Sequence, residues 1–552
     1  MKTKRLTHHL KILLISIFTS ILFVTILIVG IIKLLSPFKV SVYNYESYLD
    51  KKIINKIKKD YSYHVFTNLD EFTKAIKNKK AVAGVSSDYQ IAELILENKI
   101  KKINFEKAFD LKDLNEEKIM NLYSRDTKEQ FDYFDWWIIQ KIKEKNPNNI
   151  KAKLDENKDI LPYIYYEKDV PVGFEIDGKT GIDKFYQFLI PYFTLDKMVV
   201  YNTEDSEIYK STRNNIKENV NFNDIKDGLS WEKTISMLVS KYKKPKVYWT
   251  NWFQDNLMIG QFHQKESEIP GPDLEHFKWK LVNKKNYKNL INSFSTFVEK
   301  STGATIKNSN VNKLVTDGQE LVSSIIEPKS GKADIAIMYN GDALDAYYGR
   351  DNFIQLNEKN NISFVRPKYS YKNIDAWIIS KDTRDFDSDL LLDKLNKTIF
   401  SDVKLTLEAI EKLYIENVYN LLIKNDSNKK LEYDTNLFKD NLANNTKEYK
   451  NLSEINDSFF KENYGCFKKA FQIENLTNIM NFNTINYTPS YKTIKEFIRK
   501  WYFLDKNKQP DEKAISIFDL NTAKNTIFRP YQPLDLELRT KLIDWYYEKT
   551  KS

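Results

Sequence analysis

The stretch KVSVYNYESYLDKKIINKIKKDY, residues 39–61, joins a short β-rich segment to a helical one and sets the fold class. Its first part, 39–44, has the composition of a strand. Leu49, Ile53 and Ile57 then recur at helical spacing. The junction between the two parts is rich in tyrosine and acidic residues, which is an unusual combination for a simple turn.

The same strand-to-helix order recurs twice downstream. We expect strands at YHVF (63–66) and AVAGV (81–85), and helices at 68–80, where Asn68 begins a capping-box pattern, and at 88–99. Such alternation predicts an α/β fold with a mostly parallel sheet and helices on its faces. Ligands of open sheets bind beyond the carboxyl ends of the strands, where each strand leads into a helix.

Further elements are expected in the rest of the chain. They are a hairpin at 174–182, a strand crossing between two lobes at 188–202, strands leading into helices at 245–262 and 332–349, and a strand at 369–380. The Asn- and Lys-rich segment 424–451 is expected to be a solvated surface insertion.

An uncharged run of 21 residues, 12–32, precedes this region. As a helix it would be about 31 Å long, which matches the hydrocarbon thickness of a bilayer. Lys2, Lys4 and Arg5 lie before it, so the positive-inside rule predicts a cytoplasmic N-terminus and an extracellular C-terminal domain. A cleaved signal peptide is the competing interpretation, but the run is long for one and no small-x-small cleavage site follows it. We expect an uncleaved single-pass anchor in the cell membrane.

Composition narrows the class of protein. The 552 residues are 41% hydrophobic and 14% aromatic, enough for at least two globular lobes. The net charge is +10, but Lys and Arg are spread along the chain, so we expect no nucleic-acid partner. The single cysteine, Cys466, is far from the apolar run, which argues against lipid attachment there. A second long apolar run is not found, so the chain is not itself a permease.

Five short motifs then suggest a family. They are VYNYESYLD, GVSSDYQIAELI, IPYFTLDKMVVYN, IMYNGDAL and IDAWIIS. Their order and spacing resemble the spermidine/putrescine-binding proteins of bacterial ABC importers, which have the two-lobed class II periplasmic-binding-protein fold. The resemblance is clearest over residues 40–100, 188–202, 245–260 and 332–380, and the segments between them are longer than is usual in that family.

The resemblance implies a domain organisation. Residues 1–37 would be the cytoplasmic tail and transmembrane anchor, 38–195 the first part of lobe 1, 196–368 lobe 2, and 369–552 the return to lobe 1 with the C-terminal helices. The crossings near 190–200 and 362–372 would form the hinge. A protein of this kind captures a polyamine and passes it to ABC permease subunits and their ATPase.

The resemblance also implies a set of ligand-binding residues. They are Tyr45, Tyr48, Ser87, Tyr89, Trp252, Asp255, Tyr339, Asp375 and Gln532. Two positions depart from the family: Trp252 stands where another acid is often found, and Asn373 where a tryptophan is often found.

These residue types suit a polyamine. Aromatic faces bury methylene groups and attract cations by roughly 0.5–2 kcal/mol each. Carboxylates form strong charge-assisted hydrogen bonds with ammonium groups. Because a body with a charge of +10 does not attract a cation at long range, recognition would be local, through Asp255 and Asp375.

Structural roles compete with binding at several of these positions. Tyr45 and Tyr48 could be packing residues, and Asp255 an ordinary first-turn acid. Asp342 is predicted to be a helix cap rather than a ligand contact. An unpaired Asp375 inside an apolar strand would be costly, which favours a ligand-facing role.

Enzymatic signatures are weak, so we expect no catalysis and no cofactor. The sequence lacks the phosphate-binding G-x-x-x-x-G-K-[ST] loop, the G-x-G-x-x-G fingerprint and an H-E-x-x-H motif. Two alternatives to polyamine binding stay open. One is a binding protein for another solute, such as a cationic vitamin or a sugar, and the other is a surface adhesin on the same fold.

Overall fold

The computed structural model describes most of the chain. The described residues are 2–35, 39–67, 69–151, 161–178, 181–204, 207–213, 215–264, 281–349, 362–425, 455, 457–472 and 476–551. Asn68 and nearly all of the predicted insertion at 424–451 lie outside them.

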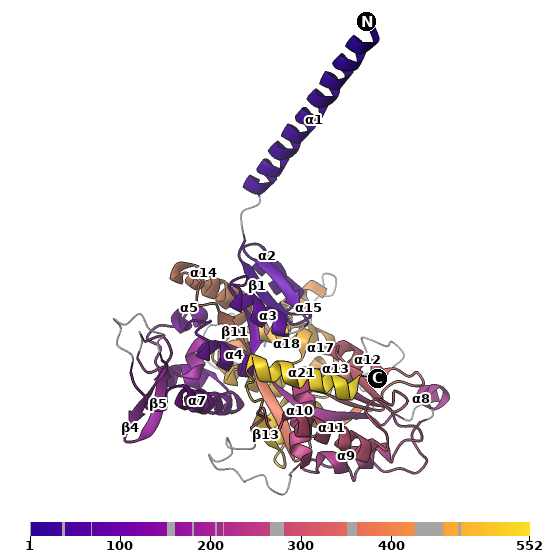
Figure 1. The fold of residues 1–552 in the computed structure, drawn as a ribbon. Helices are drawn as coiled ribbons and strands as arrows, with labels where there is room; N and C mark the ends of the chain where they lie inside the picture. Colours follow the sequence, from indigo (N-terminus) through magenta and orange to yellow (C-terminus); the bar gives the residue numbers. More distant parts are fainter. Residues whose placement is uncertain are drawn as a thin grey trace.

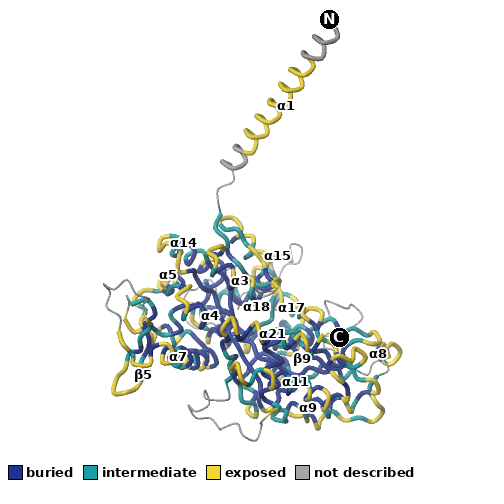
Figure 2. Tube along the Cα trace, in the orientation of Figure 1, coloured by how far each residue is buried: buried dark blue, intermediate teal, exposed yellow. Residues whose placement is uncertain are grey.

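A long apolar helix stands apart from the rest of the molecule (Figure 1). Helix α1 spans Lys2–Leu35 and contains the run Leu10–Val29, whose mean hydropathy is 3.0. Its side chains in that run are exposed, Phe18 by 69%, whereas the interior of the body is buried (Figure 2). The predicted apolar helix is confirmed, and it is long enough to cross a membrane.

The opening segment of the body forms one end of the main sheet. In chain order its elements are β1 (Ser41–Tyr45), α2 (Lys51–Lys58), β2 (Ser62–Phe66), α3 (Leu69–Lys77), β3 (Ala83–Ser87) and α4 (Asp88–Leu96). The three strands are parallel, with β1 in the middle. Helix α2 begins after Asp50, whose side chain accepts a hydrogen bond from the Lys52 amide, and it buries Ile53 and Ile57. The predicted alternation of strands and helices is confirmed.

Two long strands join this end of the sheet to the other. Strand β6 (Ile190–Asn202) pairs with β11 (Tyr369–Ile379) over residues 190–196 and with β9 (Ile335–Tyr339) over 197–201, antiparallel in both cases. All of β6 and β11 is buried. The predicted strand is confirmed, whereas the two lobes that it would connect, and hinge motion between them, stay predictions.

The far end of the sheet holds the remaining strands of the path. They are β7 (Val247–Thr250), which leads into α10 (Phe253–Gln264), β8 (Asn312–Val315) and β9, which leads into α13 (Asn340–Tyr348). The full path is β2-β1-β3-β11-β6-β9-β7-β8, with β10 (Ile362–Val365) and β12 (Thr488–Pro489) beside β6 and β13 (Ile527–Pro530) beside β11.

The other helices cover the sheet or lie around it (Figure 1). Their bounds are α5 Phe105–Phe109, α6 Glu116–Leu122, α7 Arg125–Lys145, α8 Glu207–Thr212, α9 Trp231–Val239, α11 Tyr287–Thr302, α12 Gly318–Ile326, α14 Asp385–Leu395, α15 Leu407–Asn425, α17 Asp457–Lys469, α18 Thr477–Ile485, α19 Lys492–Phe497, α20 Glu512–Phe518 and α21 Leu536–Thr550.

A hairpin precedes the predicted one. Strands β4 (Tyr163–Glu167) and β5 (Val170–Glu175) pair antiparallel, which was not expected from the sequence. The predicted reversal at the following Asp-Gly is confirmed, because Phe174 and Asp183 exchange backbone hydrogen bonds of 2.9 and 2.8 Å.

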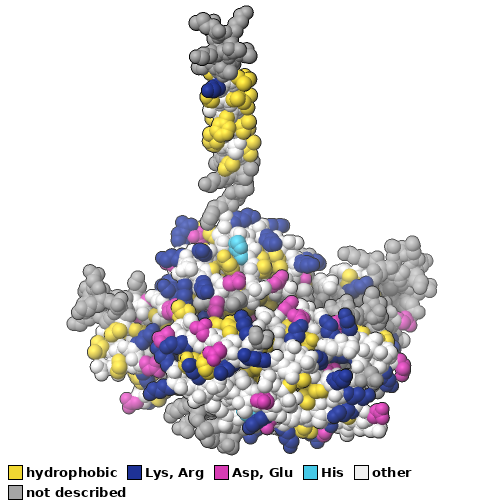
Figure 3. Space-filling model, turned by 45° about the vertical axis from the view of Figure 1, so that its right-hand side comes forward, with side chains coloured by type: hydrophobic (Ala, Val, Ile, Leu, Met, Phe, Trp, Pro, Cys, Tyr) yellow, Lys and Arg dark blue, Asp and Glu magenta, His cyan; other side chains and the backbone are white. Residues whose placement is uncertain are grey.

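The surface carries no single basic stripe on the face shown in Figure 3, where Lys and Arg are interspersed with Asp and Glu. Inside, one large hydrophobic core extends across the sheet. A smaller cluster packs α10 and α11 against the C-terminal helix α21, through residues such as Leu257, Ile291 and Leu542.

Candidate ligand-binding site

Asp375 lies in the middle of β11, where the strand bends. It is opposite Ser87 of β3 and Phe193 of β6, and the register with β6 shifts between Asp375 and Ala376. Such bulges redirect side chains and are common beside binding sites. The carboxylate therefore sits at the carboxyl end of β3, where the sequence predicted a ligand.

Neutral donors surround the Asp375 carboxylate. Tyr48 donates its hydroxyl to Oδ2 at 2.7 Å, Ser87 donates to Oδ1 at 2.6 Å, and Asn373 donates its amide to Oδ1 at 3.1 Å. The Tyr45 hydroxyl lies 3.2 Å from that of Ser87 and extends this network. Four residues named by the resemblance thus meet at one point.

The Asp375 carboxyl group has no cationic partner in the described ranges. The residue is only 4% exposed, and burial raises the pKa of its carboxyl, while the hydrogen bonds from Ser87, Tyr48 and Asn373 lower it. A buried carboxylate held only by neutral groups is poorly compensated. A ligand ammonium at this point would supply the missing charge.

Aromatic rings form walls around this carboxylate. The Tyr48 ring centroid lies 5.1 Å from that of Tyr45, 5.4 Å from that of Phe193 and 5.4 Å from that of Tyr487. Tyr487 was not predicted, because it reaches the site from a distant part of the chain just before β12.

Asp255 forms a second polar cluster from the first turn of α10. Its Oδ1 accepts a hydrogen bond of 2.6 Å from the Tyr531 hydroxyl, and its Oδ2 lies 2.7 Å from the Lys197 ammonium. That ammonium lies 3.5 Å from the centroid of the Tyr339 ring. Tyr339 and Tyr531 are themselves linked, with their hydroxyls 3.1 Å apart.

Tyr89 connects the two clusters. Its ring centroid lies 5.2 Å from that of Tyr531. Burial raises the pKa of its phenol well above the usual value, and the negative charges of Asp255 and Asp375 raise it further. Both acids therefore lie within electrostatic reach of one phenol.

Alternate residues of β11 lie on the same side of the strand as Asp375. Tyr371, Asn373 and Asp375 share one face of the strand because side chains alternate. The Tyr371 hydroxyl and the Asn373 Oδ1 are buried and have no hydrogen-bond partner among the described residues. Period-2 spacing from Asp375 was the signal that could have added Tyr371 and Asn373 to the predicted site.

The side chains of Trp252 and Gln532 contact residues outside the two carboxylate clusters. The Trp252 ring packs on Phe253, with centroids 4.9 Å apart, in the smaller core cluster. The Gln532 side chain bonds both backbone groups of Val282, at 2.6 and 3.0 Å. Their ligand-binding roles stay predictions.

Asp342 is not the N-cap residue of α13, but its carboxylate accepts a hydrogen bond from the backbone of the N-cap residue, as the third residue of a capping box does, so the predicted capping role is confirmed in part. Tyr339 is the N-cap residue, and Asp342 lies in the first turn, where it accepts a hydrogen bond of 2.8 Å from Tyr487. Tyr487 also packs on Tyr48, so Asp342 holds one ring of the aromatic wall in place through this hydrogen bond.

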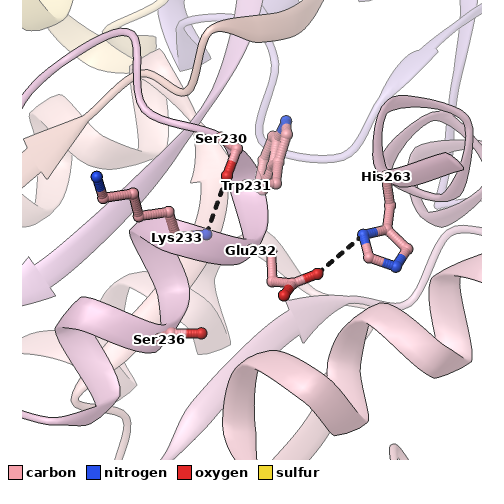
Figure 4. A pocket seen from close by; sticks show the side chains of 6 residues that line it. All are labelled: Ser230, Trp231, Glu232, Lys233, Ser236 and His263. Carbon is pink, nitrogen blue, oxygen red and sulfur yellow. Dashed lines mark hydrogen bonds and ion pairs between the residues drawn. The ribbon is translucent and has the colours of Figure 1, made fainter. Parts of the chain in front are cut away.

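A separate hollow of about 460 Å³ opens at the surface beside α9 and α10 (Figure 4). It is lined by Ser230, Trp231, Glu232, Lys233, Ser236 and His263. Its His263 Nδ1 lies 3.3 Å from Glu232 Oε2. None of the nine predicted ligand-binding residues lines it.

The chain has an α/β periplasmic-binding-protein-like fold preceded by an apolar N-terminal helix. It belongs to the family described as hypothetical lipoprotein (MG045 family), whose model matches residues 8–551.

Solved structures of solute-binding proteins are distantly similar. A candidate spermidine/putrescine ABC transporter from Listeria monocytogenes is 13% identical, with a TM-score of 0.44 and coverage of 93% of this chain and 99% of that one. PotD from Streptococcus pneumoniae is 13% identical, with a TM-score of 0.43 and coverage of 93% of this chain and 98% of that one. The maltodextrin-binding protein MalE1 from L. casei BL23 is 11% identical, with a TM-score of 0.41 and coverage of 93% of this chain and 92% of that one. No curated protein sequence matches the chain.

Proposed function

We propose that this chain is a membrane-anchored extracellular solute-binding protein that captures a small organic amine for an ABC importer. The sequence resemblance names the polyamines spermidine and putrescine as candidates, and the contacts of Lys197 bear on how many cationic groups the solute carries. The protein performs no bond chemistry, and closure of two lobes around the solute would hand it to the permease and its ATPase.

The Asp375 carboxylate is the observation that carries this proposal. It is buried, held by Tyr48, Ser87 and Asn373, and has no cationic partner in the described ranges. The neighbouring Asn373 Oδ1 is a buried acceptor with no partner among the described residues. An ammonium bound here would neutralise the first group and satisfy the second.

The tyrosine walls support the same class of ligand. Rings of Tyr45, Tyr48 and Tyr89 can bury methylene groups and attract a cation through their faces. A neutral sugar would use such rings for stacking, but it would leave the Asp375 charge uncompensated. The carboxylate therefore favours an amine over the sugar alternative.

Titration calorimetry of the full chain in detergent micelles tests the proposal. Putrescine, spermidine, thiamine and maltose are compared at pH 7. We expect saturable heat with at least one of the three cations and none with maltose. Heat with maltose alone would replace the amine by a sugar, and the absence of heat with all four would favour an adhesin on this fold.

A further inference from the structure

The Lys197 ammonium has the surroundings, a carboxylate and an aromatic ring, that the predicted site would offer to an ammonium group of the ligand. It is 1% exposed, as is Asp255, and the ammonium lies 2.7 Å from the Asp255 carboxylate and 3.5 Å from the Tyr339 ring centroid. A carboxylate on one side and an aromatic face on another are what an organic ammonium requires.

The position of Lys197 is fixed by the sheet. Lys197 is paired with Tyr339 in the register of β6 and β9, so the cation and the ring are neighbours across the ladder. The hydroxyl of Ser370, on β11, donates to the Lys197 carbonyl at 2.6 Å, which ties the same residue to the other neighbouring strand. The backbone of Lys197 is thus held between two strands, and its ammonium contacts Asp255 of α10 and the Tyr339 ring of β9.

The two carboxylates consequently differ in what they can accept. Asp255 accepts a hydrogen bond from Tyr531 at Oδ1, and its Oδ2 lies 2.7 Å from the Lys197 ammonium in an ion pair without hydrogen-bond geometry. Asp375 has hydrogen-bond donors but no cation among the described residues. A second ligand ammonium would have to approach Asp255 beside the buried Lys197 ammonium, and like charges in such a place are costly.

We propose that Lys197 is a built-in ammonium that takes the place of one ligand nitrogen, so that the site selects solutes with a single cationic group over diamines. This inference rests on the proposed function. The ligand's ammonium binds at Asp375, and its neutral remainder lies along the tyrosine rings toward Tyr89 and Tyr531. Lys197 is therefore a residue that determines specificity.

Butylamine and putrescine test this inference, because they share a four-carbon chain and differ by one ammonium group. Their affinities are measured by calorimetry for the full chain and for Lys197→Met. The wild type should bind butylamine more tightly than putrescine. Lys197→Met frees Asp255, so the ratio of putrescine affinity to butylamine affinity should rise at least about tenfold.

The double variant Lys197→Met/Asp255→Asn serves as the matched control. It removes both charges of the buried pair, so it avoids an unpaired carboxylate and should fold even where the single variant does not. It should show no gain in putrescine affinity over the wild type.

The outcomes separate the two proposals. Tighter binding of putrescine than of butylamine by the wild type would overturn the role of Lys197 and leave the proposed function standing. Failure of both amines to bind the wild type and both variants would overturn the proposed function, and this inference with it.

Discussion

Asp88, the first residue of α4, has a buried carboxyl group that contacts the backbone of Ile374, the residue before Asp375. Its Oδ2 accepts hydrogen bonds of 2.8 Å from both the Gln130 side chain and the Ile374 amide. Burial is the main cause that raises its pKa to about 8. An unfolded chain would release this proton near pH 4.

This shift predicts how the free energy of unfolding depends on pH. Between about pH 4 and 8 the folded chain holds a proton that the unfolded chain has lost, so the contribution of Asp88 to stability falls as pH rises. The wild-type urea midpoint should be higher at pH 5 than at pH 7.5, and Asp88→Asn should therefore reduce the difference between these two midpoints. Asp382→Asn, at a side chain that is 53% exposed, is the control and should leave that difference unchanged. An unchanged difference in Asp88→Asn would contradict the shift.

Single residues of the site were predictable to different degrees. Asp375 was named by the family resemblance, and its place in an apolar strand supported a ligand-facing role because a carboxylate there needs a partner. Asp196 and Lys197 are the charged residues of an otherwise uncharged strand. Because a buried charge needs a partner, these two residues could also have been predicted to form ion pairs, and this signal was missed. Their partners could not be predicted from this pattern, because Asp196 binds Arg366 at 2.6 Å and Lys197 binds Asp255, both distant in sequence.

At the scale of elements, the close contact of α10 with α11 positions Asp255. A Cβ atom at Gly260 of α10 would lie 2.1 Å from the Leu290 carbonyl oxygen of α11, so only glycine fits. Gly260→Ala should therefore separate the helices and lower the free energy of unfolding by about 1–3 kcal/mol.

Gly465 of α17 offers a matched control for this prediction. A Cβ there would meet no atom within 4 Å, so Gly465→Ala should stabilise the helix by roughly 0.5–1 kcal/mol. Urea unfolding measures both variants. Equal effects of the two substitutions would contradict the account of the α10–α11 contact.

Elements with strong local patterns were predicted, and those defined by distant pairing were not. Strands and helices from β1 to α4 follow from alternating composition and helical spacing. Asp342 is not the N-cap residue because Tyr339, the last residue of β9, takes that position directly. The tyrosines contributed near β12 and β13 depend on the sheet order, which composition alone does not reveal.

For the whole molecule, the exposed run Leu10–Val29 of α1 predicts how the protein is held at the membrane. The full chain should stay in the membrane fraction after an alkaline carbonate wash, and deletion of residues 2–35 should release it. Cys466→Ser should not change this partition, because Cys466 is the only cysteine and lies in α17. Release of the Cys466→Ser variant would instead indicate a lipid anchor on that cysteine.

The central claim is that a ligand ammonium binds at Asp375. The most direct measurement compares the affinities of butylamine and putrescine for the full chain and for Asp375→Asn, with Asp382→Asn as the exposed control. The variant should lose about 2–5 kcal/mol of binding free energy for each amine that binds the wild type, while the control should lose none. Equal amine affinity in the wild type and in Asp375→Asn would contradict the account.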